Sequence, residues 1–204
     1  MNYIDTIKHV NTESKFELLV NGNLNVENAA MIYKNFSGRP TFVNPQGGKR
    51  TFSLALSEDY GERLSDMGWN VKVKEVKDQL EEGERTRTVS FADYAANFRT
   101  EFDHALIYTE IVVNENSDYP PKIFKISEFG GEKTMASMPP EQWSRLDECE
   151  LSCVDIVIHP YAHGRSLANP DAKKGYLKSM YAVAVPVGNE FGGKYADYRM
   201  VGEE

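Results

Sequence analysis

The chain has 204 residues, of which 41% are hydrophobic and 11% aromatic, so it can bury a core and is not globally disordered. Its 23 basic and 31 acidic residues give a net charge of −8, which excludes a uniformly basic nucleic-acid binder. Any binding of nucleic acid must therefore depend on where the basic residues gather.

Short alternating segments bounded by turn residues predict strands along most of the chain. About seven strands are expected, from candidates at residues 15–20, 23–36, 50–57, 69–76, 105–113, 121–126, 150–159 and 175–187. Two or three short helices are expected, from candidates at residues 57–68, where Ser57 is a good N-cap, near 91–98, and at 139–147.

The segment 35–57 is expected to form a hairpin with a basic, flexible tip. Alternation from Arg50 to Ser57 places Phe52, Leu54 and Leu56 on one face of its second strand. A proline and paired glycines in residues 44–48 supply the turn.

Three parts of the chain are expected to lie outside the central domain. Residues 1–22 begin without a clear period and are expected to form an N-terminal arm. Residues 77–103 are rich in charge and are expected to be an insert rather than core. Residues 188–204 combine glycines, aromatics and terminal acid and are expected to form a flexible tail. The central domain then spans residues 23–187.

The expected fold class is mostly β, an antiparallel barrel with a few short helices. No alternation of strand and helix suggests a doubly wound sheet. The OB-fold, a five-stranded Greek-key barrel that binds single strands through its loops, is the natural candidate, with inserted segments.

Basic residues gather in two windows. Residues 29–56 hold four basic residues and no acidic one, and residues 156–188 hold four against one, so together they carry +7 and the rest of the chain −15. Both windows also contain aromatics, and single-stranded DNA is bound by cations for phosphate and aromatic faces for bases. We expect single-stranded DNA to be contacted by residues of both windows and by two lysines of the strand between them. These residues are Lys34, Phe36, Arg39, Phe42, Lys49, Arg50, Lys72, Lys74, Tyr161, Arg165, Lys173, Lys174, Tyr176, Lys178 and Tyr181.

These residues cannot all line one groove. Alternation along a strand points Lys34 and Phe36 to opposite faces. Phe52, Tyr176 and Leu177 can equally belong to the core. The groove is expected between residues 34–52 and 161–181.

Signatures of catalysis and of secretion are absent from the sequence. No phosphate-binding glycine loop or nucleophile elbow occurs, and Pro160 argues against a helix that would let His159 and His163 share a metal. We therefore expect no enzyme activity, no metal and no cofactor. Cys149 and Cys153 lie four apart on one expected strand, roughly 13 Å and too far for a disulfide. With no signal peptide and no apolar run of the roughly 20 residues that span a bilayer, a cytoplasmic location is expected.

Several short segments resemble a group of phage early proteins in the same order along the chain. They are residues 35–38 (NFSG), 44–52 (NPQGGKRTF), 68–72 (GWNVK), 120–123 (PPKI), 155–161 (DIVIHPY), 176–181 (YLKSMY) and 194–197 (KYAD). This group is the phage-encoded single-stranded DNA-binding proteins of OB-fold type. The insert at 77–103 is longer and more charged than the family pattern, and the loop at 162–174 lacks the family's tryptophan.

The resemblance implies sequence-independent binding of single-stranded DNA during phage DNA replication or recombination, in the host cytoplasm. Replication or recombination proteins are further expected partners through the C-terminal tail, and the oligomeric state, including a homo-oligomer, is left open. One alternative is a protein-interaction module, an inhibitor or adaptor of a host factor whose acidic body mimics nucleic acid. A second is a metal-dependent nuclease using carboxylates such as Glu148, Glu150 and Asp155.

Overall fold

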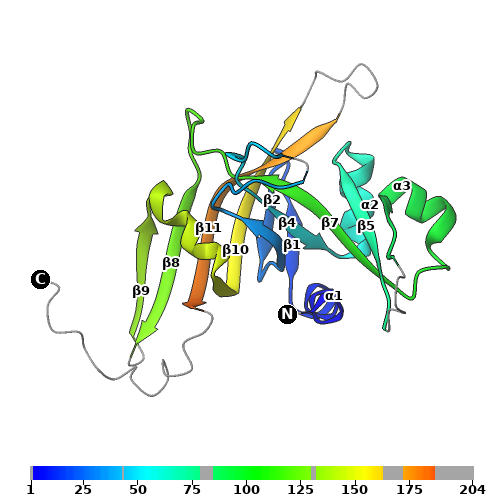
Figure 1. Ribbon diagram of the computed structural model, residues 1–204, viewed down its shortest axis with the longest axis horizontal. Helices are drawn as coiled ribbons and strands as arrows, with labels where there is room; N and C mark the ends of the chain where they lie inside the picture. Colours follow the sequence, from blue (N-terminus) through cyan, green and yellow to red (C-terminus); the bar gives the residue numbers. More distant parts are fainter. Residues whose placement is uncertain (1, 43, 79–84, 130–131, 163–171, 187–204) are drawn as a thin grey trace, which may run out of the picture.

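The computed structural model describes residues 2–42, 44–78, 85–129, 132–162 and 172–186, which form eleven strands and five helical segments (Figure 1). The strands are β1 (Lys15–Leu18), β2 (Leu24–Glu27), β3 (Met31–Asn35), β4 (Thr51–Leu56), β5 (Val71–Val76), β6 (Thr88–Ser90), β7 (His104–Val112), β8 (Lys122–Phe129), β9 (Glu132–Met138), β10 (Cys149–Ala162) and β11 (Lys173–Pro186). The helical segments are α1 (Tyr3–Thr12), α2 (Glu58–Asp66), α3 (Phe91–Asp93), the π-helical turn η1 (Tyr94–Phe98) and the 3-10 helix η2 (Pro140–Asp147). The mostly β fold class is confirmed, with more strands than the seven expected.

Six of these strands close into a small barrel. β2 and β3 are the halves of one bent segment, since β2 pairs with β10 and β3 with β4 on either side of Asn28, whose φ is 55°. Around the ring, β4 pairs antiparallel with β7, β7 pairs in parallel with β11, and β11 pairs antiparallel with β10. A hydrogen bond from the Ala29 amide to the Val154 carbonyl (2.7 Å) joins the bend to β10. With the bent segment counted once, five strands form the ring, as in an OB-like barrel. The single long strand expected over residues 23–36 is therefore wrong.

Alternation decides which side chains fill the barrel. Phe52, Leu54 and Leu56 of β4 all lie in the main core cluster, as expected from their shared face. Ala55 points outward instead, and it is also buried, because α1 covers it.

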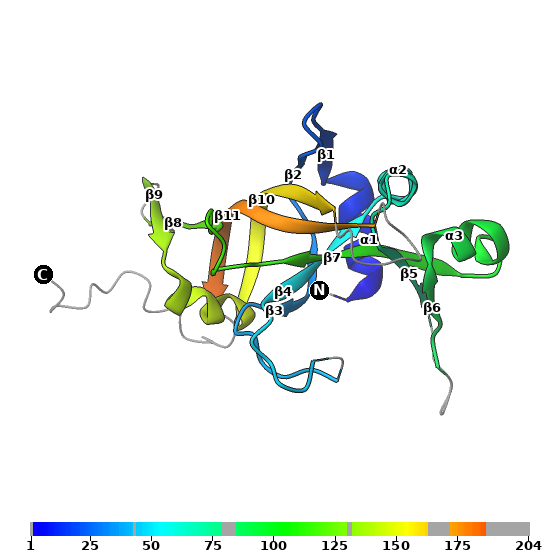
Figure 2. The same cartoon turned by 90° about the horizontal axis from the view of Figure 1, so that it is seen from above.

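Helix α1 takes the place of the irregular arm expected at the N-terminus. Asn2 caps it, and its side-chain oxygen accepts a backbone N–H of the first turn at 2.8 Å. Ile7 and Val10 pack with Ala55 of β4 and Leu106 of β7 in a second apolar cluster outside the barrel. The helix therefore lies on the outward face of two barrel strands (Figure 2).

The segment after β5 belongs to the core, so the expectation of an excluded insert is wrong for residues 85–103. β6 extends the sheet by pairing with β5. The helix expected near 91–98 is present as α3 and η1, and Phe91, Tyr94 and Phe102 are buried in the main cluster. Residues 79–84 of the expected insert lie outside the described residues.

The buried Glu75 joins this segment to the sheet through an ion pair with the part-exposed Arg87. Its carboxylate accepts from the Arg87 Nε at 3.3 Å and from the Arg87 amide at 3.1 Å. Burial raises the pKa of Glu75, but the hydrogen bonds and charge of Arg87, with the charge of Lys77, outweigh it and lower that pKa below 4.5.

We expect this lowered pKa to appear as acid sensitivity. A carboxylate with a lowered folded-state pKa contributes stability above its ordinary pKa of 4.5, and that stability is lost as the pH falls through the lowered value. Urea unfolding midpoints measured between about pH 6 and about pH 3 should fall more steeply in the unaltered protein than in Glu75→Gln. Equal slopes in the two proteins would show that the pair does not contribute.

In the second half of the chain, the strands and their pairing differ from those expected. β8 and β9 form a hairpin at the side of the barrel opposite α3 (Figures 1 and 2), and β9 was not anticipated. β11 pairs in parallel with both β7 and β8, so the sheet is antiparallel in most but not all of its pairs. The expected turn at 130–131, most of the loop at 162–174 and the tail at 188–204 lie outside the described residues. In the described part of the chain, no helix has the length and apolar character needed to cross a membrane.

Candidate nucleic-acid interface

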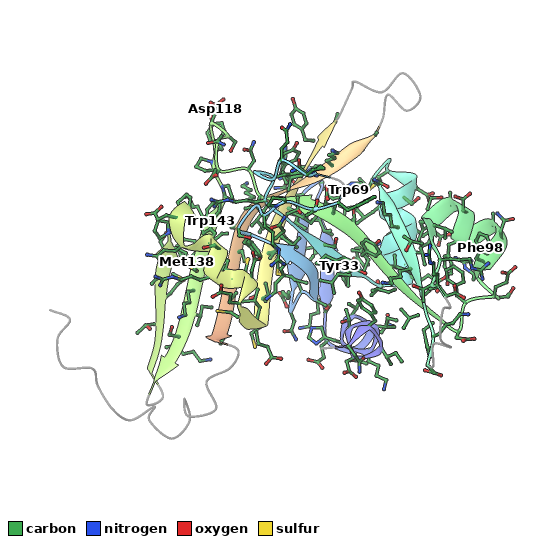
Figure 3. The ribbon with its side chains drawn as sticks, viewed as in Figure 1. Tyr33, Trp69, Phe98, Asp118, Met138 and Trp143 are labelled. Carbon is green, nitrogen blue, oxygen red and sulfur yellow. The ribbon has the colours of Figure 1, made fainter. Side chains whose placement is uncertain are left out.

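An open groove of about 610 Å³ lies on the outward surface of the barrel, where β10 ends and β11 begins. We call it the tyrosine groove, and its lining residues are Asn114, Ser117, Asp118, Tyr119, His159, Tyr161, Tyr176, Leu177 and Lys178. The segment between β7 and β8 forms one wall of the groove. Figure 3 shows Asp118 of this segment at the end of the molecule where β10 ends and β11 begins.

Three tyrosines give the groove its aromatic character. Tyr119 is 91% exposed and Tyr161 is 59% exposed, which is unusual for side chains of this size. The rings of Tyr161 and Tyr176 meet edge to face with centroids 5.9 Å apart. In the paired strands β10 and β11, Tyr161 lies opposite Lys174 and Tyr176 lies opposite His159.

Polar groups stand beside these rings. Lys178 is exposed on β11, next to a register shift between β10 and β11. His159 lies opposite Tyr176, and its Nδ1 bonds the Asn23 Oδ1 at 2.8 Å. Since an amide oxygen only accepts, Nδ1 carries the proton and Nε2 is the acceptor of the neutral ring.

Sequence reasoning missed Tyr119, which lies in a segment without periodicity.

The hairpin 36–50 carries further cations beside β7. Arg39 is exposed and Phe42 is fully exposed, while Lys49 pairs with Glu110 of β7. Gly47 has φ 71°, and a side chain there would bring its Cβ within 2.9 Å of the Gly38 carbonyl oxygen. Glycine is therefore needed for the close turn that shapes this hairpin.

The two basic windows meet across β7. Val112 of β7 pairs with Thr51 of β4 on one side and with Tyr176 of β11 on the other. The hairpin and the tyrosine groove therefore flank one strand, and a DNA groove between residues 34–52 and 161–181 stays a prediction.

Three of the expected contact residues have structural roles instead. Phe36 is 0% exposed and stacks on Phe52, with ring centroids 5.7 Å apart, so no base can reach it. The Lys34 ammonium donates to the carbonyls of Leu146 (2.9 Å) and Cys149, and burial lowers its pKa.

Arg50 is the third such residue. Its guanidinium donates to the Pro140 carbonyl at 2.7 Å, pairs with Glu115 at 3.2 Å and lies 5.4 Å from the centroid of the Trp143 ring. These contacts fix η2 against the hairpin, so the Arg50 charge is engaged within the protein.

The remaining expected residues are dispersed. Lys173 and Lys174 are half-buried at the start of β11, beside the groove, and Arg165 lies outside the described residues. Tyr181 stacks on Phe124 with centroids 4.9 Å apart. It lines a different hollow with Glu27 and Asp155, where acidic groups would repel phosphate.

Lys72 and Lys74 lie on the outward face of β5 among aromatic residues that the sequence did not bring together. The Lys74 Nζ is 4.5 Å from the Tyr3 ring centroid and 5.8 Å from that of Tyr33. Tyr33 in turn meets Tyr108 edge to face at 5.6 Å. We call these five residues the tyrosine–lysine surface.

No cluster in the described residues suggests a metal centre, since no three or more histidine, cysteine or acidic side chains converge there. His163, considered with His159 as a metal pair, lies outside the described residues.

Comparison with known proteins places the chain in a family. Residues 13–204 match a family model described as "Putative phage ssDNA-binding domain". No curated protein matches the chain significantly. The match confirms the resemblance to phage single-stranded DNA-binding proteins that the short sequence segments suggested.

Solved structures of a single-stranded DNA-binding protein from bacteriophage Enc34 are also similar. Its complex with single-stranded DNA is 12% identical with a TM-score of 0.41, covering 85% of this chain and 93% of that one. A C-terminal truncation is 13% identical (TM-score 0.40, covering 82% and 88%), and a third structure is 12% identical (TM-score 0.39, covering 88% and 93%).

Proposed function

The chain belongs to the family of phage single-stranded DNA-binding domains, and from that premise we propose that it binds single-stranded DNA without sequence preference in the tyrosine groove. The observation that supports this location is the set of three tyrosines, Tyr119, Tyr161 and Tyr176, beside the exposed Lys178 in one open hollow. The groove lies at a loop end of an OB-like barrel, where such barrels bind oligonucleotides.

The chemistry of the groove accounts for a lack of sequence preference. Every base has a π-face, so stacking on Tyr161 or Tyr176 accepts any of them and is worth about 1–3 kcal/mol per base. Lys178 in the groove and Lys173 and Lys174 beside it suit phosphate, which carries no sequence information. The groove needs no catalytic group for this task, and we propose a binding protein without enzyme activity.

The proposed biological role follows from this kind of binding. A protein that covers single strands regardless of sequence protects them while phage DNA is replicated or recombined in the host cytoplasm. We further propose that residues 188–204, with their aromatic and acidic composition, contact replication or recombination proteins.

Titration of a labelled oligo-dT at several salt concentrations tests the function directly. With the three cations Lys173, Lys174 and Lys178 near the DNA, the logarithm of the affinity should fall with the logarithm of salt concentration at a slope of about −2. Lys178→Ala should make that slope shallower by about 0.7. Absence of binding at low salt, or an affinity independent of salt, would contradict the proposal.

A second candidate function is favoured by one observation, the acidic hollow further along β10 and β11. Its volume is about 610 Å³, and its lining includes Glu17, Glu27 and Asp155 beside the ring of Tyr181. Such a surface suits a basic protein partner, as an inhibitor or adaptor of a host factor would need. Recovery of one host protein by the purified chain, together with no affinity for oligo-dT, would select this function over the first.

A further inference from the structure

We propose that the tyrosine–lysine surface, which includes Tyr3 of α1, is a second contact segment for the DNA strand held in the tyrosine groove. The inference rests on the proposed function, because it extends the same strand over more of the barrel. Its members are Tyr3, Tyr33, Lys72, Lys74 and Tyr108.

Tyr33 is the centre of this surface and has a costly conformation. Its φ of 50° lies in the left-handed region, which a bulky side chain rarely adopts. The ring is nevertheless 45% exposed, so burial in the core does not account for the strain. Edge-to-face contacts with Tyr3 at 6.1 Å and Tyr108 at 5.6 Å fix its orientation. A rigid, exposed ring of this kind is a platform on which a base can stack without further ordering.

Two cations accompany the platform. Lys74 is held over the Tyr3 ring, and its Nζ donates to the Tyr33 hydroxyl at 3.3 Å. Lys72 is exposed and pairs across strands with Tyr108. A phosphate on the β5 side of a base stacked on Tyr33 would therefore meet these lysines.

β7 connects this surface with the tyrosine groove. Tyr108 and Val112 point outward from the same strand, and four residues of strand separate them by roughly 13 Å. Val112 pairs with Tyr176, which lines the groove. Between them, Glu110 is paired with Lys49, so its negative charge is neutralised along this path.

The far end of the surface is marked by acid. Tyr33 also borders a hollow whose lining includes Asp147 and Glu150. Their charge would repel phosphate, so the strand is expected to end its contact near Tyr33.

Helix α1 is an addition to the part of the chain that defines the family. The family match begins at residue 13, and α1 ends at Thr12. Tyr3 packs beside Lys74 and Tyr33 and so adds an aromatic residue to a surface that the matched region leaves incomplete. The groove and the second segment can therefore be tested separately.

Oligomers of two lengths distinguish the segments. An oligo-dT of about five nucleotides should occupy the tyrosine groove alone, whereas one of about sixteen should reach both segments. We expect Tyr33→Gly to weaken binding of the longer oligomer about tenfold and to leave the shorter one unchanged. Glycine suits the left-handed backbone, so this variant removes the ring while relieving strain and should remain folded. Lys72→Ala should show the same dependence on length to a smaller degree, and Lys133→Ala, on exposed β9, is the charge-matched control.

Each result decides the matter. Loss confined to the longer oligomer supports the second segment. Equal losses on both oligomers, or no loss on the longer one, would overturn it while leaving the groove intact. Failure of the unaltered protein to bind either oligomer at low salt would overturn the proposed function and this inference with it.

Discussion

Replacement of both Tyr161 and Tyr176 by alanine is expected to lower the affinity for oligo-dT by at least about 30-fold. Each ring offers a stacking face for one base, and each such contact contributes about 1–3 kcal/mol. Fluorescence anisotropy with labelled oligo-dT measures the change. A smaller effect is expected from each single substitution, because one ring remains on which a base can stack.

Two control variants separate stacking from other effects. Replacing both tyrosines by phenylalanine keeps the rings and should preserve most of the affinity. Tyr181→Ala removes a half-buried tyrosine from the same strand, at the acidic hollow, and should leave DNA binding unchanged. If Tyr181→Ala weakened binding as much as the double variant, the strand would have to run through the acidic hollow.

The largest effect on stability is expected from Phe36→Ala, a loss of about 3–5 kcal/mol in the free energy of unfolding. Phe36 is fully buried and stacks on Phe52, so alanine leaves a cavity between two barrel strands. Because small domains are stable by only about 5–15 kcal/mol, chemical denaturation should show a large shift in midpoint. The folded fraction should bind oligo-dT as the unaltered protein does, since Phe36 cannot contact a base.

Phe42→Ala is the matched control within the same hairpin. Phe42 is fully exposed, so its removal should change the free energy of unfolding by less than about 0.5 kcal/mol. If Phe42→Ala destabilised the protein and Phe36→Ala did not, the assignment of inside and outside along this hairpin would be reversed.

Strands, helix ends and turns that depend on neighbouring residues could be predicted from the sequence. Alternation in residues 50–57 and 69–76 identified β4 and β5 and which of their side chains face inward. Ser57 and Gly68 bracketed α2, and proline with glycine marked the hairpin turn. Helix α1 was not predicted, because its few apolar residues are spaced along a mostly polar segment. Their partners, such as Leu106, lie far away in sequence.

The site could be predicted only in part, for a related reason. Of the residues in the basic and aromatic windows, Tyr161, Tyr176 and Lys178 share one groove. Lys34 and Arg50 have the same residue types as the residues proposed to contact DNA. Their engagement depends on partners about 65 to 115 residues away, such as Cys149 and Glu115, which no local pattern reveals. Tyr33 was missed because its exposure results from a backbone irregularity between β3 and β4.

The position of the DNA is tested most directly by photo-crosslinking a short oligomer that carries a halogenated pyrimidine, followed by identification of the attached peptides. The account predicts attachment to the tyrosines of the groove, Tyr119, Tyr161 and Tyr176, and loss of that attachment when Tyr161 and Tyr176 are replaced by alanine. Attachment confined to the β8–β9 hairpin or to the acidic hollow around Tyr181 would contradict it.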